Sequence, residues 1–234
     1  MSHHHHSYNV VVVTIAGILG VLAIITEYFR KRKANLFVAK IAFRRISGRE
    51  FRRMLGKHKY ACLTSRIASP ATGDYFQGTY EGVISCIFTI ATGGKYTTTR
   101  RLAVLLKGDF SHLPHFIVKS KSFSGEVGDM LGLRKHDPLY PMRLIDKYDV
   151  ISDDSTATAS ILTSQFVDYS LTEEGIGVES FGGDLLIYTI LDVVPENYEV
   201  AIRQAYRLAG LLGIKHDTTG GKSNQDAPDQ KAVR

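Results

Sequence analysis

The chain has 234 residues, of which 44% are hydrophobic and 22% are charged, which is the composition of a globular protein. Its net charge of +6 is uneven: thirteen Lys or Arg and one acid lie between Arg30 and Arg66, whereas residues 67–234 carry 16 basic and 21 acidic side chains. The positive charge therefore belongs to one segment near the amino terminus, which excludes a uniformly basic domain.

The apolar composition of residues 10–29 predicts a transmembrane helix. The seventeen uncharged residues from Val10 to Thr26 would form a helix of about 26 Å, close to the roughly 30 Å core of a bilayer. Tyr28 and Phe29 extend this helix into the interface. A buried core helix fits less well, because the segment has no polar face. A cleaved signal peptide also fits less well, because no Lys or Arg precedes the span and no small-x-small cleavage site follows it.

Four consecutive cations, Arg30 to Lys33, follow the span directly. Because cations flanking a span favour the cytoplasmic side, residues 1–9 are expected outside the cell membrane and the large carboxy-terminal part in the cytoplasm. The histidine run within residues 1–9 does not by itself indicate a metal site.

Three small residues, Ala16, Gly20 and Ala23, share one face of the predicted span. Small residues let membrane helices approach closely, so this face is a candidate homodimer contact. The alternative explanation is that glycine is simply common in such spans.

Residues 30–58 are predicted to be a basic juxtamembrane linker with a short amphipathic helix. Ser47 and Glu50 have the spacing of a capping box, and Ile46 and Phe51 that of a hydrophobic staple. Cations this close to a span are expected to contact anionic lipid headgroups. Nucleic acid is not expected as a partner, because no binding motif accompanies the charge. The predicted lipid-contact residues are Arg30, Lys31, Arg32, Lys33, Arg44, Arg45, Arg49, Arg52 and Arg53.

Residues 59–214 are expected to form an α+β domain, in which antiparallel strands are closed by a carboxy-terminal helix. Strand-forming runs at 75–92, 96–107 and 115–120 follow one another and imply a meander, with a hairpin turn at 92–95. A short strand, "KYDVIS", precedes one acid-capped helix that begins at Ser152 to Asp154. A hairpin around "GGD" precedes the closing helix, which begins at Pro195 and ends at Gly213. Residues 215–234 are polar and are predicted to be disordered.

Residues that could carry chemistry are few. His112 and His115 have a metal-like spacing only on a helix, and Pro114 argues against a helix there. Cys62 and Cys86 are expected to be core thiols. The acids of "SDDS" are better explained as helix caps. We therefore expect no cofactor, no metal site and no catalytic residue.

The order of features from about Leu102 to Leu212 resembles a family of uncharacterised single-pass bacterial membrane proteins. The segments that carry the resemblance are "LPHF", "YDV", "SDDSTATASIL", "VESFGGDLLIY" and "IRQAYRLAGLL". These motifs are structural, so the resemblance implies a fold and an anchor but no catalytic residue. The loop "RKHDPLYP" departs from the acidic version found in that family.

Two functions from different classes fit this sequence. The first is a membrane-anchored, non-enzymatic binding or scaffolding module at the cytoplasmic membrane face. The alternative is a membrane-anchored hydrolase whose polar residues come together only in the folded chain. A pocket with converging His, Asp or Ser side chains would favour the enzyme, and a flat apolar patch would favour the binding module.

Overall fold

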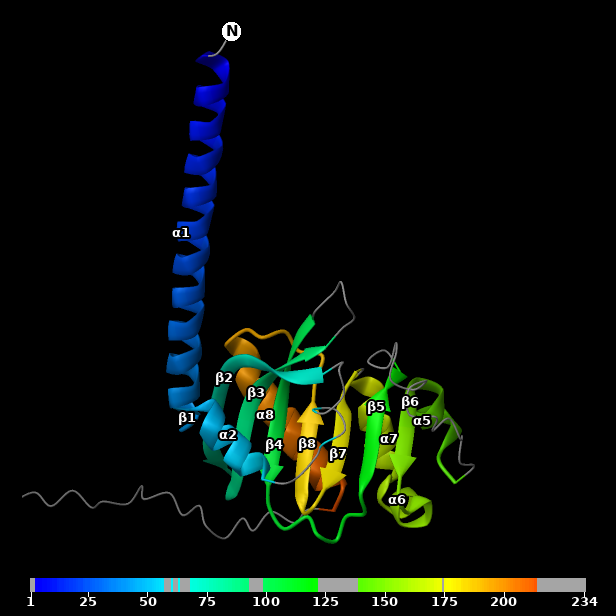
Figure 1. The fold of residues 1–234 in the computed structure, drawn as a ribbon. Coiled ribbons are helices and arrows are strands. Elements are labelled where there is room, and N and C mark those ends of the chain that lie inside the picture. The colour runs from blue at the N-terminus through cyan, green and yellow to red at the C-terminus, as the bar shows by residue number, and fades with distance from the viewer. Residues whose placement is uncertain are drawn as a thin grey trace, which may run out of the picture.

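The computed structural model describes residues 3–56, 60, 63, 68–92, 99–121, 139–173 and 175–213. The structure is α+β, with an eight-stranded antiparallel sheet, a long apolar amino-terminal helix and a carboxy-terminal helix (Figure 1). The expected fold class is confirmed at this level. The elements follow in the order α1 (His3–Lys40), β1 (Arg44–Ile46), α2 (Gly48–Leu55), β2 (Ala68–Tyr80), β3 (Val83–Thr92), β4 (Thr99–Lys107), β5 (Phe116–Ser120), α5 (Met142–Lys147), β6 (Tyr148–Ser152), α6 (Ser155–Ile161), α7 (Ser164–Thr172), β7 (Gly177–Phe181), β8 (Asp184–Tyr188) and α8 (Glu196–Leu211).

Helix α1 is longer than the predicted span and continues without a break to Lys40. Residues 30–40, "RKRKANLFVAK", are mostly good helix formers, so the helix persists where a linker was expected. By length and composition, Val13–Leu36 is sufficient to cross a membrane, and none of its apolar stretch is buried inside the structure. Among the described side chains, those that join the domain core from the last turns of α1 and the turn after it are Ala34, Ile41 and Phe43.

The short helix α2 follows its local sequence signals. The Ser47 hydroxyl accepts a hydrogen bond from the Glu50 backbone N–H at 3.2 Å, and the Glu50 carboxylate accepts one from the Ser47 N–H at 2.7 Å. Phe51 is buried and lies 4.4 Å from the Tyr75 ring and 4.6 Å from the Phe88 ring, measured between ring centroids. The apolar side of α2 therefore packs on the sheet, as its staple residues predicted.

The sheet is covered on two faces. The first face carries α5, α7 and α8, and the second face carries α2, which lies in front of the sheet in Figure 1 while α8 lies behind it. In the middle of β4, Leu102, Val104 and Leu106 point to the first face, and Ala103 and Leu105 to the second. All five are buried, because successive strand residues alternate between two covered faces.

The strand order is β1-β2-β3-β4-β8-β7-β5-β6. The predicted meander is correct from β2 to β4 and wrong beyond it, because the β7–β8 hairpin inserts between β4 and β5. Gly182 and Gly183, with φ of 62° and 82°, form the turn of that hairpin as predicted. The predicted turn at residues 92–95 falls mainly outside the described residues. The predicted tail at 215–234 lies wholly outside them.

Two helical details differ from expectation. The acid-capped helix after β6 is two helices, because Thr163 starts α7 by accepting a hydrogen bond from the Phe166 N–H at 3.2 Å. The short helix α5 was not predicted. The closing helix α8 agrees with expectation, since its predicted apolar stripe is buried along its whole length: Tyr198, Ile202, Ala205, Ala209 and Leu212.

Candidate functional site

The nine predicted lipid-contact cations fall into two groups that the structure keeps apart. The collar group, Arg30 to Lys33, lies in α1 directly after the apolar stretch, and the described side chains of Lys31, Arg32 and Lys33 are exposed. The side chain of Arg30 lies outside the described part. The foot group lies in β1 and α2, and all of its members are exposed: Arg44, Arg45, Arg49, Arg52 and Arg53.

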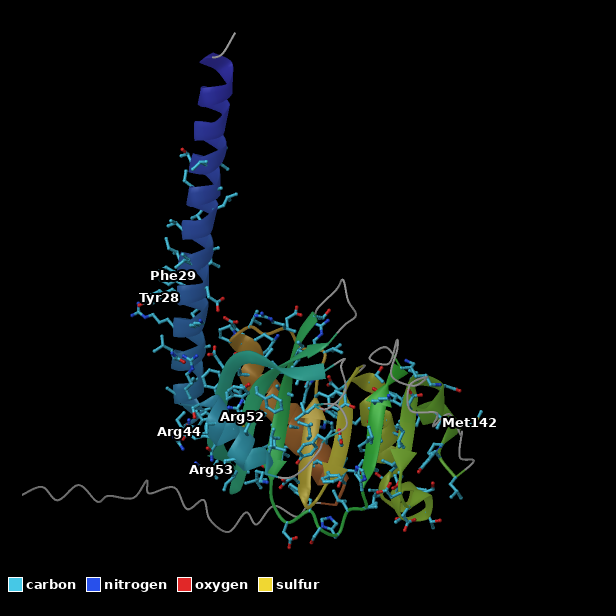
Figure 2. All side chains as sticks on the ribbon, viewed as in Figure 1. Tyr28, Phe29, Arg44, Arg52, Arg53 and Met142 are labelled. Carbon is cyan, nitrogen blue, oxygen red and sulfur yellow. The ribbon has the colours of Figure 1, made fainter. Side chains whose placement is uncertain are left out.

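The separation of the two groups follows from the length of α1. Lys33, the last member of the collar group, and Lys40, the last residue of α1, are seven positions apart, which is about 10 Å along a helix. Figure 2 shows Tyr28 and Phe29 partway along α1 and Arg44 and Arg53 at its foot. A Debye length at physiological salt is about 8 Å. One flat surface perpendicular to α1 therefore does not meet both groups.

Several of these cations have acidic neighbours. Lys31 lies 3.6 Å from Glu27 on the preceding turn of α1, and Arg44 lies 3.7 Å from Glu50. Arg45 is paired with Asp74. Hydrogen bonds from the Ser47 backbone and side chain lower the pKa of Glu50, so its carboxylate stays ionised beside the foot group. Surface pairs of this kind contribute little to stability and leave the cations accessible.

An aromatic pair marks the junction between the apolar stretch and the collar group. The rings of Tyr28 and Phe29 lie edge to face with centroids 5.8 Å apart, and both side chains are more than half exposed. Tyr is enriched at the headgroup level of membranes because its ring combines an apolar body with a polar hydroxyl. The sequence of exposed features along α1 is therefore apolar, aromatic and then basic.

A polar cluster on the second face of the sheet was missed from the sequence. Asp184 is buried and is paired with the ammonium of Lys107, and it accepts a hydrogen bond from the Tyr60 hydroxyl at 3.3 Å. Glu179 and Lys119, both buried, lie on the same face in β7 and β5. Burial lowers the pKa of Lys119, and the charge of the facing Asp149 opposes this shift. The sequence predicts the hairpin that contains Asp184, and strand alternation is the signal that indicates its inward side chain.

His115 is paired with an acid rather than with His112. Its Nδ1 lies 2.8 Å from Asp153 Oδ2, and its ring packs edge-on against Phe181. The nearby Ser152 hydroxyl hydrogen-bonds to the backbone carbonyl of His115 and not to its ring. No group of three or more possible metal ligands occurs among the described residues. The contact that the structure shows for His115 is the one with Asp153, and the expectation that His112 and His115 form no metal pair stays a prediction.

One of the two cysteines, Cys86, lies in the described structure. Cys86 is fully buried, and burial raises the pKa of its thiol strongly, so it is an unreactive core side chain. Cys62 lies outside the described residues. The small residues Ala16, Gly20 and Ala23 are all exposed on α1, which leaves the predicted helix contact open to a partner.

Comparison with protein-family models, with curated proteins and with solved structures found no match. The family resemblance of residues 102–212 stays a prediction. Function is therefore argued from the geometry of the chain itself.

Proposed function

We propose that this chain is a non-enzymatic binding or scaffolding module that α1 anchors in a membrane, with the domain on the cytoplasmic face. One observation supports this most directly. The apolar stretch of α1 is unburied, whereas its last turns pack into the domain core. A stretch of exposed aliphatic side chains this long requires an apolar environment, and a helix satisfies all of its own backbone hydrogen bonds in lipid.

The orientation rests on the collar group. Its Lys and Arg follow the apolar stretch, and no Lys or Arg precedes it. We expect a reporter that is active only in the cytoplasm to be active when it is fused after Arg234. An inactive reporter would overturn the orientation. A matched variant with Lys31, Arg32 and Lys33 replaced by Gln and Ser7 by Lys should lower the reporter activity, because the charge bias sets the topology.

Lipid contact is proposed for the collar group first. Each cation near an anionic surface contributes about 1 kcal/mol, and this falls off within a Debye length. The foot group lies beyond Lys40, which is about 10 Å past Lys33 along the helix, so it is more than one such length farther from the apolar stretch than the collar group. Its contact with the same surface therefore requires a strong tilt of α1.

Two variants that each remove three charges separate these contributions. One replaces Lys31, Arg32 and Lys33 by Gln, and the other replaces Arg49, Arg52 and Arg53 by Gln. The full chain is placed in mixed vesicles, and its preference for a fluorescent acidic lipid over a neutral one is measured at low and high salt. We expect the first variant to lose the preference and the second to keep it. If neither variant and neither salt concentration changes the preference for acidic lipid, lipid contact by these cations is rejected.

The hydrolase stays a second candidate because of His115. Asp153 holds its Nδ1, and its buried Nε2 has no hydrogen-bond partner in the structure. A carboxylate-oriented imidazole is the arrangement of a general base. Labelling of the full chain by a fluorophosphonate probe tests this candidate. Labelling that disappears in His115→Asn would favour the hydrolase, and no labelling is expected of a binding module.

A further inference from the structure

The loop between β8 and α8, residues 189–195, forms the rim of the domain that faces the apolar part of α1. It leads directly into α8, which contacts α1. Figure 1 shows this loop at the end of the sheet that points toward the amino-terminal part of α1. The opposite end of the sheet carries the hairpin turns at Gly82 and Gly183.

The rim has a fixed position along α1. Ala34, the first residue after the collar group, is only 4% exposed and belongs to the same core cluster as Tyr198 and Ile202 of α8. The domain therefore begins within one helical turn of Lys33. A membrane surface at the level of Tyr28 to Lys33 would lie against the rim.

The rim loop is held in shape by hydrogen bonds. The Leu102 N–H donates to the Leu191 carbonyl at 3.3 Å, and the Thr189 N–H donates to the Leu102 carbonyl at 3.0 Å. The Asn197 side-chain amide donates to the Asp192 carbonyl at 3.0 Å. These bonds join the loop to β4 and to the first turn of α8, so its side chains have defined directions.

Two aliphatic side chains point outward from this ordered loop. Ile190 is 45% exposed and Val194 is 40% exposed, whereas Leu191 and Val193 between them pack against the core. The Ile190 side chain also fills the space beside Gly175, where an added Cβ would lie 2.1 Å from it. Single exposed aliphatic residues are common on protein surfaces, so what marks Ile190 and Val194 is their position on the rim that faces the apolar part of α1.

Among the described residues at this loop, charges of opposite sign occur together. Arg101 is paired with Asp192, and the exposed Arg100 is offset by the exposed Glu196 in the first turn of α8. Attraction of this rim to a lipid surface would therefore come from its apolar side chains and would not require acidic lipid. This distinguishes the rim from the collar group.

We propose that Ile190 and Val194 insert into the interfacial layer of the membrane that α1 spans, as a second membrane contact that fixes how the domain is turned about the helix. The inference rests on the proposed function, because the level of the rim is set by α1 acting as the anchor. The occupant of this surface is the lipid bilayer, and neutral and acidic bilayers should serve equally well.

The test uses the full chain in vesicles, with an environment-sensitive fluorophore on single introduced cysteines after Cys62→Ser. Cys86 is fully buried and stays unlabelled. The two rim positions are Ile190→Cys and Val194→Cys. Leu22→Cys in α1 reports the anchor. Ile84→Cys is the matched control, because Ile84 is also an exposed aliphatic residue, at 46%, but pairs with Lys107 at the opposite end of the sheet.

The measured quantity is the quenching of each label by lipid-borne quenchers in neutral vesicles. We expect strong quenching at Leu22, quenching at both rim positions several times greater than at Ile84, and no loss in high salt. If the label at Leu22 is strongly quenched but the rim labels are quenched no more than the label at Ile84, the rim contact is rejected and the anchor is retained. An unquenched label at Leu22 would overturn the anchor and the rim contact together. Equal quenching at Ile84 and the rim would also reject the inference, because the domain would then lie on the membrane in another way.

Discussion

Replacement of Tyr206 by Phe tests how α8 is fastened to the sheet. The Tyr206 hydroxyl donates to the Tyr80 carbonyl at 2.6 Å and lies 2.7 Å from the Ser85 hydroxyl. Its ring also packs edge to face on the Tyr80 ring, with centroids 4.7 Å apart. The hydroxyl therefore joins the third and fourth turns of α8 to the β2–β3 hairpin, which is far from it in sequence.

The expected cost at neutral pH follows from burial. Tyr206 is 4% exposed, and the substitution leaves buried hydrogen-bonding groups without their partner while keeping the ring. A buried group that loses its partner costs roughly 1–3 kcal/mol. We expect Tyr206→Phe to lower the free energy of unfolding by about that amount at pH 7.

The pH dependence gives a second, sharper expectation. Burial raises the pKa of Tyr206 from 10.0 to about 12 in the folded chain. Because the folded pKa is the higher one, the stabilisation is complete below about pH 10 and is lost as the pH rises from 10 toward 12. One pKa unit corresponds to about 1.4 kcal/mol, so at pH 11 the wild type should have lost roughly that much through this group. Tyr206→Phe lacks this loss, so the difference in the free energy of unfolding between wild type and variant should narrow as the pH rises from about 10 to about 11.

Urea unfolding of the full chain in mild detergent measures both effects. Because the chain has no Trp, near-UV circular dichroism of its tyrosines reports tertiary structure. Tyr28→Phe is the matched control, since its ring is 61% exposed, and it should unfold as the wild type does. Equal stability of Tyr206→Phe and wild type at pH 7, or a gap that stays constant up to pH 11, would refute the reasoning.

Three further changes probe the domain by the same unfolding assay. Ile202→Asp places a charge in the fully buried stripe of α8 and should lower the free energy of unfolding by more than about 4 kcal/mol. Arg203→Gln on the exposed side of α8 should have little effect. Similar losses for the two variants would show that the buried face of α8 is misassigned. Gly177→Ala would set a Cβ 1.8 Å from the Tyr188 ring and should cost about 1–3 kcal/mol; an unchanged midpoint would contradict this close approach. Ser47→Ala removes the capping box of α2 and should cost about 1 kcal/mol; no loss would mean that α2 does not depend on its cap.

Features encoded within a few neighbouring residues were predictable. Ser47 and Glu50 cap α2 as their spacing indicates, and Gly182 and Gly183 form a tight turn because both have positive φ. The buried stripe of α8 follows directly from helical spacing, with Ile202 fully buried as predicted. In each case one local interaction decides the conformation, so the sequence pattern is sufficient.

Features that depend on distant pairings were not predictable in the same way. The β7–β8 hairpin could be identified locally, but its insertion between β4 and β5 depends on contacts between β8 and β4 about 80 residues apart. Asp184 illustrates the consequence for the candidate site. Its partners Lys107 and Tyr60 come from distant segments, so the buried ion pair is visible only after the strands are in register.

The continuity of α1 changes how the basic segment is understood. A flexible linker after the apolar stretch would let all nine cations reach the same lipid surface. In the structure, the helix continues to Lys40 and Ala34 is fixed in the domain core, so the collar group stays beside the apolar stretch and the foot group is carried away from it. If α1 is the proposed anchor and stands upright, the foot group faces the aqueous side, where we expect an acidic protein surface to match its charge better than lipid does. Under the same proposal, this fixed joint would place the rim loop against the bilayer, so the proposed membrane contact at Val194 and a foot group away from lipid would both follow from one continuous helix.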